Sequence, residues 1–124
     1  MDKTFNITGT TKLTCLLGNP VSHSISPAMH NASFQKLGID CVYLAFPVDE
    51  AHFERAIDGL ITLGAAGWNC TMPLKRLMYD RVDTLSDSAL LSGAVNTVVN
   101  RDGQLFGDNT DGYGFLQSMR EAGF

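Results

Sequence analysis

Short apolar runs alternate along the chain with segments in which apolar residues recur every three or four positions. Apolar or β-branched runs of strand length occupy residues 13–17, 41–48, 65–71, 94–99 and 104–106. Helical spacing is found in residues 26–37, 53–61, 72–78 and 86–91, and again from residue 110 onward, where Phe115, Leu116 and Met119 follow. Strands and helices that alternate at this spacing predict an α/β fold, a three-layer sandwich with a mostly parallel sheet plus one antiparallel hairpin strand.

Cap and turn residues mark where several of these elements begin and end. Ser26-Pro27 predicts an N-cap serine followed by proline at the first helical position, and Gly38 is a natural stop for that helix. Asp102-Gly103 lies between two apolar runs and predicts a tight hairpin turn. The residues expected to form the buried stripe of the first helix are Ala28, Ala32, Phe34 and Leu37.

Length, charge and cysteine content narrow the class of protein. The 124 residues suit one domain, residues 1–124. The net charge of −4 argues against a nucleic-acid-binding protein, because such proteins present a basic face to phosphates. No apolar run approaches the length of about 20 residues that spans a membrane. Cys15, Cys41 and Cys70 are widely spaced, which predicts reduced thiols in a cytoplasmic protein, and neither a disulfide framework nor a zinc site.

Polar residues cluster directly after the predicted strands, where the ligands of open α/β sheets bind. The four clusters are Gly18–Pro27 (GNPVSHSISP), Asn69–Lys75 (NCTMPLK), Gly93–Thr97 (GAVNT) and Gly107–Gly112 (GDNTDG). In this order they resemble the substrate-binding domain of the shikimate dehydrogenase family. The family motifs G-N-P-x-x-H-S-x-S-P, N-x-T-x-P-x-K, G-A-V-N-T and G-x-N-T-D-G are each met in full, and the resemblance runs from about Lys12 to Phe124.

The resemblance implies an enzyme activity. Enzymes of this family reduce 3-dehydroshikimate to shikimate with NADPH, on the pathway to chorismate and the aromatic amino acids. One alternative is a quinate/shikimate dehydrogenase that uses NAD, and another is a non-catalytic module that binds a shikimate-type ligand. Intact Lys75 and Asp111 favour the enzyme, because a pure sensor needs no pair of residues for proton transfer.

Lys75 and Asp111 are the predicted catalytic residues. Pro73 at the first helical position would place Lys75 in the first turn of a helix, the unfavourable end of the helix dipole for an ammonium. Lys75 is therefore either a solvated lysine that tolerates this position or a group held there for proton transfer. The resemblance implies the second, with Lys75 handling the proton of the reacting hydroxyl. Asp111 would orient Lys75 and bind a substrate hydroxyl, and the sequence leaves open which of the two is the formal acid–base.

Hydroxyl and amide side chains of the same loops are the expected substrate-binding residues. Ser24 and Ser26 lie two positions apart where a helix opens, so both hydroxyls and the free amides of that helix can face one anion. A plain turn serine followed by an N-cap serine would have the same spacing. The resemblance implies that the two serines hold the substrate carboxylate. Donors and acceptors for the hydroxylated ring would come from Thr71, Asn96 and Asp111.

No metal site is expected, because the three histidines lack the spacing of metal ligands with any acidic residue. A dinucleotide-binding motif is not expected in the chain either. Its only G-x-G, Gly112-Tyr113-Gly114, lacks the third glycine and follows the last substrate motif directly.

The resemblance therefore implies that NADP is bound by a C-terminal Rossmann domain that this chain does not contain. We expect the 124-residue chain alone to be inactive. Apolar residues near its end would lose their cover in such a truncated chain and favour a homodimer; these are Phe115, Met119 and Phe124.

Overall fold

The computed structural model describes residues 6–111 and 119–123 of the chain. In these residues one sheet is formed by the strands β1 (Lys12–Gly18), β2 (Cys41–Pro47), β3 (Gly67–Cys70), β4 (Thr84–Leu85), β5 (Thr97–Arg101) and β6 (Gln104–Asp108). Their order across the sheet is β2-β1-β3-β5-β6-β4. β1 is parallel to β2 and β3, and β4 is parallel to β6, whereas β5 is antiparallel to both of its neighbours. The predicted mostly parallel sheet with an antiparallel hairpin is confirmed.

The hairpin between β5 and β6 turns at Asp102 and Gly103, as predicted. Both residues have positive φ, 53° and 89°, which tight two-residue hairpin turns require and which aspartate and glycine tolerate. Strand β4 was not predicted, because two residues at a sheet edge are too few to give a periodic pattern.

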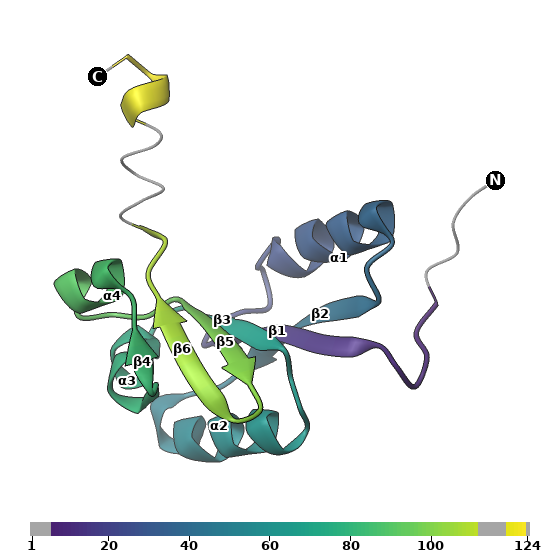
Figure 1. The fold of residues 1–124 in the computed structure, drawn as a ribbon, viewed down its shortest axis with the longest axis horizontal. Coiled ribbons are helices and arrows are strands. Elements are labelled where there is room, and N and C mark those ends of the chain that lie inside the picture. The colour runs from purple at the N-terminus through teal and green to yellow at the C-terminus, as the bar shows by residue number, and fades with distance from the viewer. Residues whose placement is uncertain (1–5, 112–118, 124) are drawn as a thin grey trace.

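Helices cover both faces of the sheet and give the three predicted layers (Figure 1). α1 (Ser26–Leu37) lies on one face, and α2 (Phe53–Thr62), preceded by the short 3-10 helix η1 (Glu50–His52), lies on the other. α3 (Lys75–Arg81) and α4 (Asp87–Ser92) join the face of α2, because Met78 and Ala89 are buried in the same cluster as residues of α2.

The strand β1 is buried on both sides, as its continuous apolar sequence predicts. Its successive side chains point to opposite faces of the sheet. Cys15 and Leu17 pack in the cluster under α2, whereas Leu16 packs with Tyr43 on the side of α1. Full burial of one large apolar side chain stabilises a fold by about 1.5–3 kcal/mol. The stripe of α2 that contributes in this way is Phe53, Ile57 and Leu60.

The predicted buried stripe of α1 is wrong. No residue of α1 is fully buried, and the members of the stripe that are exposed are Ala28, Ala32 and Leu37. Phe34 alone of the four packs partly against the sheet. The helix is instead attached through Asn31, whose amide bonds both the N–H and the C=O of Tyr43 at 2.8 Å. A polar side chain thus satisfies backbone hydrogen-bonding groups on the outer edge of strand β2, where the pattern predicted apolar packing.

The predicted N-cap of α1 is also wrong, whereas its predicted end is confirmed. Ile25 occupies the cap position without a side-chain cap bond, and the helix begins at Ser26. Ser24 supplies the acceptor instead, since its Oγ accepts the N–H of Ser26 at 3.1 Å. Gly38 ends the helix in the left-handed conformation, with φ of 68°.

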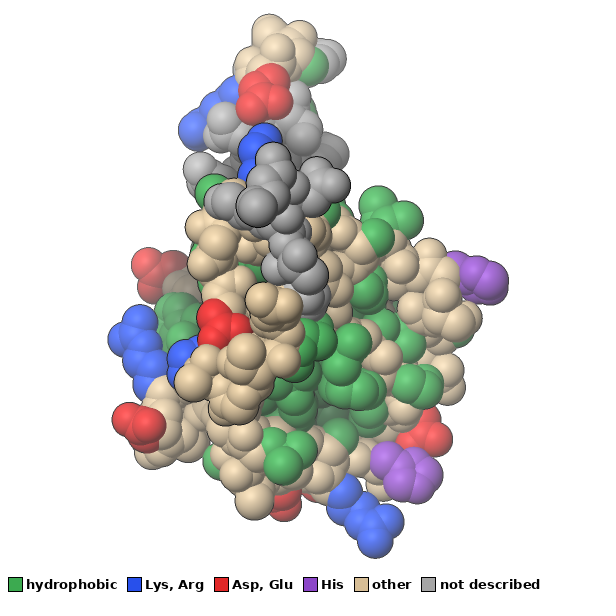
Figure 2. Space-filling view, turned by 90° about the vertical axis from the view of Figure 1, so that its right-hand side faces the viewer, with side chains coloured by type: hydrophobic (Ala, Val, Ile, Leu, Met, Phe, Trp, Pro, Cys, Tyr) green, Lys and Arg blue, Asp and Glu red, His purple; other side chains and the backbone are tan. Residues whose placement is uncertain are grey.

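Hydrophobic side chains gather in the middle of one face of the molecule, and charged side chains lie toward its margins (Figure 2). Apolar exposure is also found on the sheet itself, where the cross-strand pair Val99 and Phe106 is 38% and 39% exposed. Of the predicted dimer residues, Phe115 and Phe124 lie outside the described residues, and Met119 is 36% exposed. No described helix has both the length and the apolar composition needed to cross a membrane.

Candidate functional site

The four polar segments meet at one edge of the sheet. Because β1 and β3 are parallel, the residues that follow them, 19–27 and 71–75, leave the sheet at the same edge. β5 is antiparallel to β3, so residues 93–96, which precede it, arrive at this edge too. β6 is antiparallel to β5 and ends there, with residues 109–111 following it. The sheet topology therefore brings together motifs that lie far apart in the sequence.

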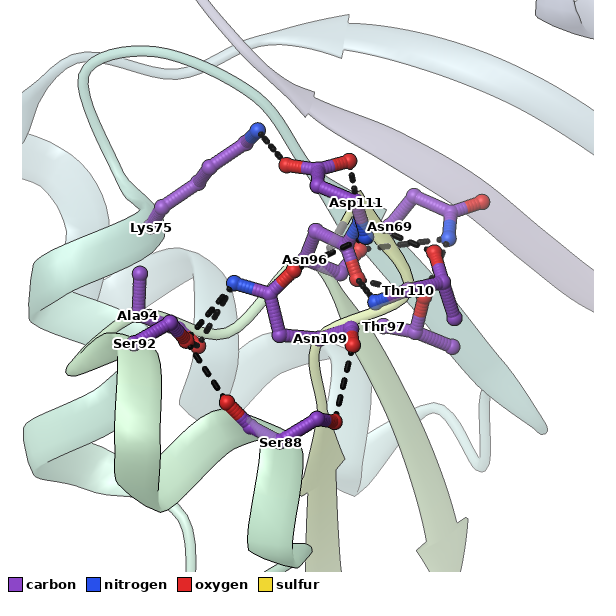
Figure 3. Close-up of polar contacts among 10 residues, drawn as sticks. All are labelled: Asn69, Lys75, Ser88, Ser92, Ala94, Asn96, Thr97, Asn109, Thr110 and Asp111. Carbon is purple, nitrogen blue, oxygen red and sulfur yellow. Dashed lines mark hydrogen bonds and ion pairs between the residues drawn. The ribbon is translucent and has the colours of Figure 1, made fainter. Parts of the chain in front are cut away.

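Lys75 and Asp111 form an ion pair at this edge (Figure 3). Nζ of Lys75 lies 2.6 Å from Oδ2 of Asp111. Lys75 is the first residue of α3 and lies in its first turn, as predicted, although Pro73 stands in the turn before the helix. The two side chains are 32% and 57% exposed, so a ligand can reach both partners.

Asn96 holds the other oxygen of the same carboxylate. Its Nδ2 donates to Oδ1 of Asp111 at 2.8 Å and to Oγ1 of Thr110 at 3.0 Å. Its Oδ1 accepts the N–H of Thr110 at 3.0 Å, and the residue is only 9% exposed. The amide of Asn96, predicted to bind substrate, is thus used within the chain to orient Asp111.

Ser24, Ser26 and Thr71 line a cavity of about 330 Å³ at the same edge, together with His23. The oxygen of Ser24 accepts the N–H of Ser26, so its hydroxyl hydrogen is the part that can be donated to a ligand. The N-terminus of α1 opens beside these hydroxyls and adds the positive end of a helix dipole. This chemistry suits an anion such as a carboxylate.

Two asparagines of the motifs, Asn69 and Asn109, were given no role in the sequence analysis. Asn69 donates to the carbonyl of Asn96 at 3.2 Å and accepts from the hydroxyl of Tyr43 at 2.8 Å. Asn109 is 6% exposed, and its Oδ1 accepts the N–H of Asp111 at 2.9 Å. Both stand inside the motifs that carry the resemblance, and this position was the signal that could have identified them.

Asp108 anchors the loop that carries Asp111. Its Oδ1 accepts hydrogen bonds from the hydroxyls of Ser86 at 2.6 Å and Ser88 at 2.9 Å, and from the N–H of Asn109 at 2.8 Å. The hydrogen bond from Ser86, with smaller contributions from Ser88 and Asn109, lowers the pKa of the Asp108 carboxyl below its usual value of 3.8. An ionised carboxylate therefore ties α4 to the site loop.

The cysteines are buried and unpaired. Burial raises the pKa of the Cys15 and Cys70 thiols to about 12, so both stay protonated near neutral pH and are poor nucleophiles. Cys70 stands inside a site motif, and its raised pKa makes it a poor candidate for a nucleophile. Within residues 6–111 and 119–123, no group of three or more His, Cys, Asp or Glu side chains could hold a metal ion.

Known proteins are similar to this chain over most of its length. Residues 16–98 match the family described as the shikimate dehydrogenase substrate binding domain. A curated relative, the shikimate dehydrogenase (NADP(+)) of Alkaliphilus metalliredigens, is 50% identical over 119 residues, which are 96% of this chain and 42% of that protein. The chain thus spans about two-fifths of the length of the curated relatives it matches.

Solved structures share the fold. The shikimate 5-dehydrogenase of Listeria monocytogenes, in complex with shikimate and NAD, matches 97% of this chain with a TM-score of 0.91 and 48% identity, over 42% of its own chain. A ligand-free 5-ketofructose reductase of Gluconobacter matches 92% of this chain with a TM-score of 0.87 and 34% identity, over 41% of its own chain. Enzymes named for different substrates therefore share this fold.

Proposed function

Because the chain belongs to the shikimate dehydrogenase substrate-binding domain family, we propose that it holds shikimate and 3-dehydroshikimate for their interconversion by an NADP-dependent enzyme. The observation that carries the proposal is the contact of 2.6 Å between Nζ of Lys75 and the carboxylate of Asp111. Oxidation of an alcohol to a ketone releases the hydroxyl proton, and a lysine–aspartate pair can accept it.

The pair moves a proton while the cofactor, when bound, takes or gives the hydride. In the direction of reduction, Nζ of Lys75 gives a proton to the carbonyl oxygen, which becomes the hydroxyl of shikimate. Asp111 orients Nζ and accepts a hydrogen bond from a substrate hydroxyl. Asn96 keeps the carboxylate directed at Lys75 by binding its second oxygen at 2.8 Å.

The substrate carboxylate is proposed to bind in the cavity lined by Ser24, Ser26 and Thr71. Hydroxyl donors beside the N-terminus of a twelve-residue helix, α1, support this assignment. Charge-assisted hydrogen bonds of this kind hold and orient the ring, while Lys75 and Asp111 act on its reacting hydroxyl.

NADP is proposed to bind outside the residues that the structure describes. A dinucleotide-binding turn needs a glycine at which the backbone can approach the phosphates closely. Gly18, the last residue of β1, serves a different purpose, because a Cβ there would collide with the side chain of Thr71 and the carbonyl of Met72. The glycines of Gly112-Tyr113-Gly114 lie outside the described residues. Gly18 therefore lacks the open backbone that a dinucleotide-binding turn needs, which supports a cofactor site elsewhere.

A quinate/shikimate dehydrogenase that uses NAD is the second candidate function, because the similar Listeria enzyme was solved with NAD. Quinate carries an extra hydroxyl on the carbon that bears the carboxylate. The space beside Ser24 should therefore affect the preference between quinate and shikimate. A non-catalytic binding module is less well supported, since it has no use for the Lys75–Asp111 pair. For either enzyme we propose the cytoplasm, where unpaired thiols such as those of this chain persist.

The proposal is tested by titrating the chain with shikimate and, separately, with quinate, and following amide NMR shifts. We expect saturable shifts at Ser24, Lys75 and Asp111 with shikimate, and weaker binding of quinate. Ser24→Ala should weaken shikimate binding by about 1–3 kcal/mol, because a charged acceptor loses a donor. Ser33→Ala is the matched control, since Ser33 is an exposed serine of α1 whose hydroxyl bonds the carbonyl of Met29.

Each outcome of this titration has a separate meaning. Absence of saturable shifts with either ligand would contradict the proposed function. Tighter binding of quinate than of shikimate would favour the second candidate. Equal affinity of the wild type and Ser24→Ala would remove Ser24 from the proposed carboxylate site while leaving the ion pair in place.

A further inference from the structure

Asn109 is buried directly behind the Lys75–Asp111 pair and uses both ends of its side-chain amide (Figure 3). Its Oδ1 accepts the N–H of Asp111 at 2.9 Å. Its Nδ2 donates to Oγ of Ser92 at 3.0 Å and to the carbonyl of Ala94 at 3.1 Å. The side chain therefore joins the backbone of Asp111 to the end of α4 and the segment that follows it.

The same segment also fixes the position of Lys75. The N–H of Val95 donates to the carbonyl of Lys75 at 3.0 Å, and the carbonyl of the preceding residue, Ala94, accepts from Asn109. The backbones of the two partners are thus held by adjacent residues. Val95 bonds Lys75 directly, and Ala94 is linked to Asp111 through the side chain of Asn109. Without this amide, the position of Asp111 would depend on its carboxylate contacts to Lys75 and Asn96.

We propose that Asn109 is a positioning residue, whose amide sets the backbone of Asp111 so that its carboxylate meets the ammonium of Lys75. Asn109 does not touch the proposed substrate, and it acts through Asp111. The geometric part of this inference stands on the hydrogen bonds of the chain alone, whereas its consequence for ligand binding rests on the proposed function. A charged pair performs its role only when its partners are held in a productive geometry by the residues around them.

The chain contains a matched control for a purely structural role. Asn100 closes the hairpin at the opposite edge of the sheet with a smaller set of bonds of the same kind, one accepted from a backbone N–H and one donated to a backbone carbonyl. Its Oδ1 accepts the N–H of Gly103 at 2.9 Å, and its Nδ2 donates to the carbonyl of Ala65 at 2.8 Å. Asn100→Ala and Asn109→Ala therefore both remove side-chain bonds to the backbone, but only the second removes a contact to Asp111.

The experiment compares the wild-type chain, Asn109→Ala and Asn100→Ala by urea unfolding, by the side-chain ¹H–¹⁵N NMR signal of the Lys75 ammonium, and by shikimate titration. Both variants should lose stability, and Asn109→Ala should lose more, because it removes three side-chain hydrogen bonds and Asn100→Ala removes two. Only Asn109→Ala should shift the Lys75 signal and speed exchange of its hydrogens with water. Only Asn109→Ala should raise the Kd for shikimate, by about tenfold, as when one charge-assisted hydrogen bond is lost.

An unchanged Lys75 signal in folded Asn109→Ala, with a Kd within about twofold of the wild type, would overturn the proposal. If Asn109→Ala does not fold, Asn109→Ser decides, because serine can still accept the N–H two residues on but loses the anchor at Ala94. A wild-type Lys75 signal in that variant would also overturn the proposal. If the wild-type chain does not bind shikimate, the proposed function fails, and the Lys75 signal still tests the role of Asn109.

Discussion

The ion pair of Lys75 and Asp111 is accessible to solvent, with side chains 32% and 57% exposed. Accessible pairs stabilise proteins by only about 0–1 kcal/mol. Lys75 also begins a helix, where the dipole disfavours an ammonium. Stability therefore does not explain a lysine at this position, whereas the proposed proton transfer does. The two explanations differ in what a mutation of Lys75 should change.

In a full-length enzyme that contains this domain, Lys75→Ala should lower kcat by about 10²–10⁴, the usual contribution of general acid–base catalysis. The KM for shikimate should change far less, and the free energy of unfolding by no more than about 1 kcal/mol. Arg76→Ala is the control, because Arg76 is the next residue of α3, is 73% exposed and should leave kcat unchanged. Steady-state kinetics check this, and turnover of Lys75→Ala within tenfold of the wild type would exclude Lys75 from the mechanism.

Asp108 should make the stability of the chain depend on pH. Its pKa is lowered in the folded state, chiefly by the hydroxyl of Ser86. Its contribution is therefore complete above the unfolded value of 3.8 and is lost as the pH falls through the folded value. Asp108→Asn should lower stability at neutral pH but reduce the further loss below about pH 4, as measured by urea unfolding.

Ser86→Ala provides the companion variant for this prediction. It removes the 2.6 Å hydrogen bond to Asp108, so the pKa of that carboxyl should rise toward its usual value in a ¹³C NMR titration. The same acid-induced loss of stability in the wild type and in Asp108→Asn would mean that other groups cause it.

At the scale of residues, the sequence predicts which side chains meet better than it predicts how they bond. The motifs identified three residues that the structure joins by hydrogen bonds, Lys75, Asn96 and Asp111. The expected cap at Ser26 was wrong, because Ser24 can form the equivalent bond from two positions earlier. Asn109 was missed because its contacts to Ser92 and Ala94 depend on how α4 packs, which spacing along the chain does not reveal.

At the scale of elements, the two serines at the start of α1 should contribute differently to stability. Ser24→Ala removes the acceptor for the N–H of Ser26 and should cost about 0.5–1.5 kcal/mol of stability. Ser26→Ala leaves that bond in place and should change stability by less than about 0.5 kcal/mol. Urea unfolding of the two variants checks this difference. A loss of about 1 kcal/mol or more in Ser26→Ala would restore Ser26 as the cap of α1.

Two glycines test how closely the elements pack. A Cβ at Gly67 of β3 would lie 2.5 Å from the carbonyl oxygen of Val98 on β5, whereas at Gly59 of α2 it would meet nothing within 4 Å. Gly67→Ala should therefore destabilise the fold by about 1–3 kcal/mol, because the two strands must move apart. Gly59→Ala should stabilise it by about 0.5–1 kcal/mol through helix propensity. Thermal unfolding should give opposite signs, and shifts of equal sign would contradict the packing described for Gly67.

Elements that bury an apolar face were predictable, and elements held by polar contacts were not. α2 and the central strands follow the hydrophobic pattern because burial decides their placement. Strand β4 depends on Asp83, whose carboxylate accepts the N–H of Leu105 at 2.7 Å. α1 depends on the bonds between Asn31 and Tyr43. Neither contact leaves a periodic trace in the sequence.

At the scale of the whole molecule, one topology explains both the resemblance and the site. Parallel β1 and β3, followed by the antiparallel pair β5 and β6, bring four separated loops to one edge of the sheet. The loops after β1 and β3 offer hydroxyl donors, and the loop after β6 offers a carboxylate paired with an ammonium. In the proposed function, these loops bind an acidic polyol and move its proton, whereas the cofactor binds outside the described residues.

This division of roles predicts that the 124-residue chain binds the substrate but does not catalyse its oxidation. The proposed substrate residues, from Ser24 to Asp111, all lie within the described part, so the chain should bind shikimate, although weakly. The exposure of Lys75 and Asp111 means that water reaches the pair, whereas efficient hydride transfer needs a closed site that excludes water. NADP⁺ should cause no saturable amide NMR shifts, and the absorbance of NADPH should not rise when shikimate and NADP⁺ are added together. Saturable binding of NADP⁺, or NADPH formed by the pure chain, would contradict this prediction.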